Sequence, residues 1–167
     1  LLWCTRTRHG RYCPPDPGGP GGAGMTRAAR TLSCPATLEH LEKITRMVEE
    51  LLRSNGVSGS DRFALGLAVD EACTNVIRYA YAPGTGTVRV ECLVTPEEAR
   101  VCIFDRGVPF NPLETAAPDT GAGLEDRPIG GLGIHLIRNL VDAASYERRE
   151  GENVLCLTRR RSDRSCG

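Results

Sequence analysis

The chain has 167 residues, with 21 basic and 21 acidic side chains and therefore no formal net charge. This length fits one domain with its own core, and the balanced charge gives no sign of a nucleic-acid or anionic-membrane partner. No apolar run approaches the roughly 20 residues that span a bilayer, and no stretch has the pattern of a secretion signal, so we expect a soluble cytoplasmic protein.

The first 24 residues differ from the rest of the chain. They are rich in Gly and Pro and show no periodicity, and the first methionine is Met25. Such a composition buries too little apolar surface to order itself. We expect a disordered extension over 1–24, which is either an upstream segment or a mis-assigned start, then one domain over 25–160 and a tail over 161–167.

Two helices are predicted after a first strand at 29–34. Apolar residues recur at helical spacing from Thr37 to Arg53, and Asn55-Gly56 ends that pattern. Ser58 to Asp61 then offers N-caps for a second helix over about 61–80.

The remaining pattern predicts two hairpins and one more helix. Residues 87–94 and 99–105 alternate or run apolar, as strands of a β-hairpin do. A long loop over 106–130 precedes a helix at 131–142, and residues 145–150 and 153–160 form a final hairpin around Gly151-Glu152. The order β-α-α-β-β-loop-α-β-β indicates an α+β, two-layer sandwich with helices on one face of a mixed, mostly antiparallel sheet.

Eight cysteines occur without a CxxC pair or a zinc-like Cys/His spacing. Cys92, Cys102 and Cys156 fall in strand-like runs, where a free cysteine behaves as a small hydrophobic residue. We therefore expect reduced, structural thiols.

Three polar motifs stand out against this framework. Within the second helix, Glu71 and Asn75 are four residues apart and lie on the same face. A carboxylate can accept a proton, and an amide oxygen can ligate Mg²⁺ without adding negative charge beside phosphates. The alternative is an ordinary solvated polar face.

The other two motifs lie at element ends. Asp105 closes a strand, and Gly107 follows it before Val108-Pro109-Phe110. The motif fits either a plain turn or a carboxylate facing a pocket where Gly107 lets a planar ligand approach the backbone. Gly130, Gly131 and Gly133 precede the third helix, where free N–H groups can hold a phosphate, although glycines at a helix entrance often serve packing alone.

The order of the three motifs resembles the GHKL ATPase superfamily, which has the Bergerat fold of gyrase and histidine kinases. The similarity extends over about residues 30–160. It consists of a helical E-x-x-x-N, then D-x-G-x-P at a strand end, then a lid, and then G-G-x-G before a helix. The stretches DEACTNVIRYAY and GGLGIHLIRNLVD are most similar to its stand-alone anti-sigma-factor serine/threonine kinases.

This resemblance implies roles for individual residues. Glu71 would be the catalytic base, and Asn75 would hold Mg²⁺ against the ATP phosphates. Asp105 would accept a hydrogen bond from the adenine amino group, and Gly107 would give the base room. Residues 111–129 would form an ATP lid, and the members of the glycine loop would contact the phosphates; these are Gly130, Gly131 and Gly133.

The resemblance also implies the activity and its partners. An ATP- and Mg²⁺-dependent kinase of this branch phosphorylates a small anti-sigma-factor antagonist and sequesters a sigma factor, commonly as a homodimer. Two alternatives stay open. One is a non-catalytic ATP-binding module that controls a partner by binding only, and the other is a regulator paired with a phosphatase.

Overall fold

The computed structural model describes residues 27–82, 85–114 and 137–162 of the chain. The elements follow the predicted order, and their bounds are β1 (Ala28–Pro35), α1 (Leu38–Ser54), α2 (Gly59–Asn75), η1 (Val76–Ala80), β2 (Thr87–Val94), β3 (Glu98–Asp105), η2 (Pro112–Glu114), β4 (Ala143–Arg149) and β5 (Glu152–Arg160).

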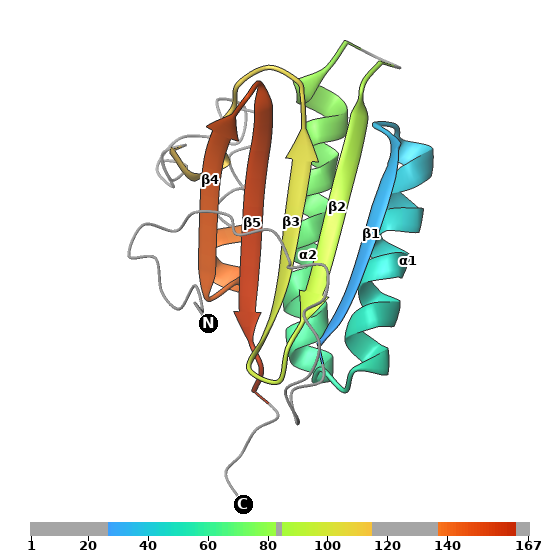
Figure 1. The fold of residues 1–167 in the computed structure, drawn as a ribbon, viewed down its shortest axis with the longest axis vertical. Coiled ribbons are helices and arrows are strands. Elements are labelled where there is room, and N and C mark those ends of the chain that lie inside the picture. The colour runs from blue at the N-terminus through green and yellow to red at the C-terminus, as the bar shows by residue number, and fades with distance from the viewer. Residues whose placement is uncertain (1–26, 83–84, 115–136, 163–167) are drawn as a thin grey trace, which may run out of the picture.

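One five-stranded sheet carries the fold, in the order β1-β2-β3-β5-β4. Every pair among these described strands is antiparallel, so the predicted mostly antiparallel sheet is confirmed. Helices α1 and α2 lie side by side on one of its faces, as Figure 1 shows. The two-layer α+β prediction is therefore confirmed as well.

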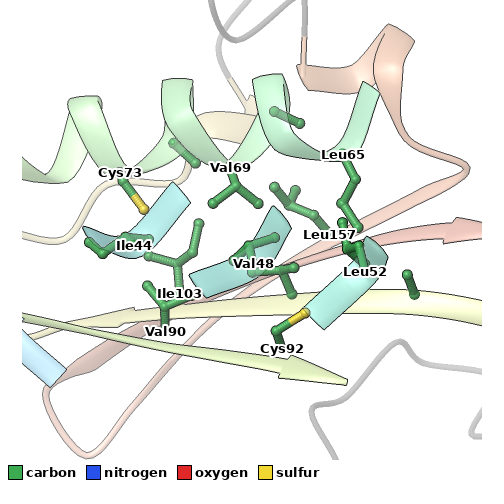
Figure 2. Packing of buried hydrophobic residues seen from close by; sticks show 14 of the residues in the cluster. Ile44, Val48, Leu52, Leu65, Val69, Cys73, Val90, Cys92, Ile103 and Leu157 are labelled. Atoms are coloured by element: carbon green, nitrogen blue, oxygen red, sulfur yellow. The ribbon is translucent and has the colours of Figure 1, made fainter. Parts of the chain in front are cut away.

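The core lies between the helices and the sheet. In β2 buried and less buried residues alternate strictly, because successive side chains point to opposite faces of a strand. Ile44, Val48 and Leu52 of α1 and Leu65 and Val69 of α2 are almost fully buried against the sheet (Figure 2). Burying each such side chain stabilises the fold by about 1.5–3 kcal/mol.

The second predicted helix changes character at its end. It begins one residue after the cap Ser58, whose hydroxyl accepts from the Asp61 N–H, and it is α-helical as far as Asn75. The next turn, Val76–Ala80, is a π-helix. Such wider turns recur at functional sites. Of the third predicted helix, residues 137–140 are helical, Val141 and Asp142 are not, and 131–136 lie outside the described residues.

The prediction of reduced thiols is wrong for one pair. Cys102 of β3 and Cys156 of β5 are directly opposite each other and form a disulfide. With Phe104 and Val154 they make a small buried cluster. Since Val101 and Ile103 belong to the main core, alternation puts this cluster on the sheet face away from the helices. Spacing along the chain does not show which strands pair, so the sequence could not reveal the bond.

Among the described residues, three other cysteines are free and buried, as predicted: Cys34, Cys73 and Cys92. Burial raises the pKa of Cys92 to about 12, so this side chain is a neutral thiol at physiological pH. In the described part of the chain, no helix is long and apolar enough to cross a membrane.

A buried carboxylate joins the start of α2 to the end of the sheet. Asp61 is 1% exposed and accepts from Arg159 Nε at 2.9 Å and from the Ser162 N–H at 2.8 Å. The hydroxyl groups of Ser162 and Ser58 donate to it as well, at 2.6 and 2.8 Å. Burial opposes ionisation, but these hydrogen bonds outweigh it and lower the pKa of Asp61 from 3.8 to about 2.

We expect Asp61→Asn to lower the free energy of unfolding at pH 7 by about 2 kcal/mol, because the variant loses the charge that these donors favour. The folded pKa is depressed, so the wild-type advantage is complete above the unfolded pKa of 3.8 and disappears as pH falls through about 2. Urea unfolding at several pH values measures the difference.

The exposed ion pair Glu42–Arg46 provides the control. Glu42→Gln should change stability by no more than about 0.5 kcal/mol, since exposed pairs on a helix contribute little. An Asp61→Asn effect as small as this, or one that does not shrink in acid, would contradict the assigned role of Asp61.

Candidate nucleotide site

A cleft of about 500 Å³, its open mouth included, lies where the end of α2 and η1 meet the sheet. Apolar side chains form much of its wall, among them Ile103, Ile137 and Leu155. Polar side chains line it from five different elements: Asn75, Tyr79, Asp105, Tyr146 and Asn153. Two of the predicted site residues, Asn75 and Asp105, are thus brought together at one cleft.

Asn75 is the last residue of α2, immediately before the π-helical turn. Its Nδ2 atom is buried and has no hydrogen-bond partner among the described residues. An unsatisfied buried polar group costs about 1–3 kcal/mol, and a bound ligand offsets that cost. Because Nδ2 is a hydrogen-bond donor, it fits a contact with a phosphate oxygen. The predicted contact of the Asn75 amide oxygen with Mg²⁺ stays a prediction.

Glu71 lies one helical turn before Asn75 on α2 and is partly buried. Among the described residues, the cleft lining includes Ala72 and Asn75 but not Glu71. The helix thus holds the carboxylate near the cleft rather than in its wall. Its predicted role as the catalytic base stays a prediction.

Asp105 ends β3 and is 7% exposed. Its Oδ1 atom accepts from the Gly107 N–H at 2.9 Å and from Asn153 Nδ2 at 2.8 Å. Burial raises the pKa of Asp105, and these two hydrogen bonds together with the Arg148 charge counteract only part of that effect. No described residue donates a hydrogen bond to Oδ2, so this oxygen is free to meet a ligand.

Gly107 has a packing role that the sequence did not show. A Cβ atom on Gly107 would lie 2.2 Å from the carbonyl oxygen of Ala80 in η1. The next residue, Val108, donates its backbone N–H to the same oxygen at 2.9 Å. The close approach fixes the loop after β3 against the π-helical turn. The room that Gly107 would give a base stays a prediction.

Sequence reasoning missed the polar group behind Asp105. Asn153 of β5 is 4% exposed and directly opposite Asp105 in the strand register. Tyr146 and Arg148 of β4 donate to its side chain, at 2.8 and 2.6 Å. The available signal was an amide at a position where the alternation of β5 requires an inward-facing side chain.

The predicted phosphate loop cannot be placed. Gly130, Gly131 and Gly133 lie outside the described residues, as do residues 115–129 of the predicted lid. Of that lid, the structure describes residues 111–114, which include the short helix η2 (Pro112–Glu114).

Comparison with known protein families agrees with the fold and the cleft described above. A family model described as the histidine kinase-like ATPase domain matches residues 34–159. The chain belongs to this family. The match covers α1, α2, the strands β2 to β4, nearly all of β5 and the cleft, and it lies inside the predicted domain of 25–160.

Relatives of this ATPase-family chain agree with the predicted branch. It is 30% identical over 135 residues to the serine/threonine-protein kinase BtrW of Bordetella bronchiseptica, covering 80% of this chain and 95% of that protein. It is 27% identical over 128 residues to the serine-protein kinase RsbW of Bacillus mycoides, covering 74% and 80%. The predicted resemblance to the kinase branch is thereby confirmed.

A solved structure of the RsbU and RsbW domains of Rv1364c from Mycobacterium tuberculosis has the same fold. The TM-score is 0.54 at 18% identity, and the alignment covers 80% of this chain and 32% of that chain.

Proposed function

We propose that this ATPase-family chain is an ATP- and Mg²⁺-dependent serine/threonine protein kinase that acts as an anti-sigma factor. It would act in the cytoplasm as a homodimer, phosphorylate a small anti-sigma-factor antagonist and sequester a sigma factor. The observation that carries the proposal is the cleft at which the buried carboxylate of Asp105 and the unpaired amide of Asn75 meet. Family membership and the named kinase relatives support it.

The proposal gives separate tasks to Asp105, Asn75 and Glu71. Asp105 Oδ2 accepts the hydrogen bond of the adenine amino group, while Ile103 and Leu155 contact the flat faces of the base. Asn75 would hold Mg²⁺ through its amide oxygen, and the ion would supply charge neutralisation at the transferred phosphate. Glu71, one turn earlier, orients the acceptor hydroxyl and takes its proton. Phosphoryl transfer depends mainly on such positioning and on charge stabilisation, to which the predicted glycine loop adds backbone N–H donors.

Calorimetric titration of ATP, with and without Mg²⁺, tests the site first. We expect saturable binding that tightens when Mg²⁺ is present. A folded sample that binds no ATP in either condition would overturn the proposed site.

Transfer of the labelled γ-phosphate of ATP onto a co-purifying protein tests the activity. Label on a serine or threonine of that protein supports the kinase. Binding of ATP without transfer to any co-purified partner would instead support the non-catalytic module.

A further inference from the structure

Asn153 has no task in the proposed reaction, yet its side chain is fully hydrogen-bonded. Its Nδ2 donates to Asp105 Oδ1 at 2.8 Å and to the Val108 carbonyl at 3.0 Å. Its Oδ1 accepts from the Tyr146 hydroxyl at 2.8 Å and from Arg148 Nη1 at 2.6 Å. An amide has two donor hydrogens and two acceptor lone pairs, so all four are in use.

Two of these partners fix which way the amide points. A guanidinium only donates, so Arg148 requires the oxygen of Asn153 on its side. A backbone carbonyl only accepts, so Val108 requires the nitrogen on the other side. Neither requirement depends on Asp105. The amide therefore presents an N–H to Asp105 whatever the protonation state of that carboxyl group.

The N–H matters for the cleft-facing oxygen. With Gly107 N–H and Asn153 Nδ2 both donating to Oδ1 of Asp105, a proton on this carboxyl group would sit on Oδ2. Ionised, Oδ2 accepts a hydrogen bond from a ligand; protonated, it donates one. Hydrogen bonds to a carboxylate favour the ionised form, while burial favours the neutral one. The balance at Asp105 thus decides which ligand group it can meet.

We propose that Asn153, oriented by Arg148 and Val108, is a positioning residue that keeps Asp105 a hydrogen-bond acceptor toward the cleft and so selects a 6-amino purine over a 6-oxo purine. The inference rests on the proposed function, in which Asp105 meets the base. A 6-amino group donates to an ionised carboxylate, whereas a 6-oxo group can only accept and meets a protonated one.

The groups that face Asp105 set its balance between these two states. Burial raises the pKa of Asp105, the Asn153 and Gly107 hydrogen bonds and the Arg148 charge lower it, and the Glu152 charge raises it. The neighbouring elements contribute these titratable or charged side chains: Tyr79 of η1, Tyr146 and Arg148 of β4, and Glu152 of β5.

The experiment compares the binding of ATP and inosine triphosphate by calorimetry from about pH 5 to about pH 8, with Mg²⁺ present. The two nucleotides carry the same phosphates, so the ratio of their affinities reports on the base. For Asn153→Leu we expect the pH at which the ATP preference disappears to rise by about one to two units. A shift of this size is expected when a charged group loses one hydrogen bond.

A second variant removes the orienting group from the protein surface. Arg148 is exposed, so Arg148→Met should fold, and it should move the pH profile in the same direction. Arg149→Met is the matched control: it removes the same charge one position along β4, where alternation directs the side chain to the other face. This control should keep the wild-type ratio at each pH.

Wild-type pH profiles in both folded variants would overturn the inference, and if Asn153→Leu does not fold, a wild-type profile in Arg148→Met alone overturns it. A weaker affinity for both nucleotides at an unchanged ratio would also do so, since it would show a merely structural role. If the wild-type protein binds neither nucleotide, the proposed function itself fails, which is a distinct result.

Discussion

Glu71→Ala is expected to slow phosphate transfer from ATP by a factor of about 10²–10⁴, the usual effect of removing a general base. The affinity for ATP should remain nearly unchanged, because Glu71 is not among the described residues that line the cleft. Single-turnover transfer onto the acceptor protein measures the rate, and calorimetry measures the affinity. A lower rate at equal affinity marks an interaction made only in the transition state.

Asp70→Ala is the matched control for Glu71. It removes a partly buried carboxylate from the adjacent position of α2, which a helix turns about 100° away from Glu71. Its transfer rate should stay close to that of the wild type. Full activity in Glu71→Ala would remove the assigned role, and an equal loss in both variants would point to a general electrostatic effect of α2.

Asp105→Asn is expected to weaken ATP binding by about 1–3 kcal/mol, or about 5- to 150-fold. The two protein donors, Gly107 N–H and Asn153 Nδ2, hold an acceptor at the Oδ1 position. In the variant the amide oxygen takes that position, so its NH₂ group faces the cleft. A donor then meets the amino group of adenine where an acceptor stood before. Calorimetric titration of ATP measures the loss.

Glu147→Gln tests whether the loss is specific to Asp105. Glu147 is next to Tyr146 on β4, and alternation directs it away from the cleft. Its removal takes one negative charge from the same region and should leave the ATP affinity as it was. An Asp105→Asn protein with wild-type affinity would exclude Asp105 from the site.

The local periodicities predicted the elements well because they arise from short-range geometry. The amphipathic pattern of α1 and the alternation of β2 follow from 3.6 and 2 residues per repeat, and both are observed. Strand register is not periodic in this sense. The pairs Cys102–Cys156 and Asp105–Asn153 both arise from the pairing of β3 with β5, and the sequence predicted neither.

Only part of the site could be predicted from the sequence. Asn75 and Asp105 were singled out by residue type and motif order, and the fold brings both to the cleft. Asn153 was not, because its inward-facing position in β5 does not show which side chain it meets, and that depends on the pairing of β5 with β3. The wide turn Val76–Ala80 was also missed, since apolar residues there fit an α-helix equally well.

The disulfide between Cys102 and Cys156 has a consequence for fragmentation of the chain. These residues are 54 positions apart, and the bond closes the intervening segment into a covalent ring. That ring contains the predicted lid and phosphate loop and the whole of β4. A single protease cut between the two cysteines therefore leaves one molecule of unchanged mass apart from an added water. Its two pieces separate on a denaturing gel only after a reductant is added.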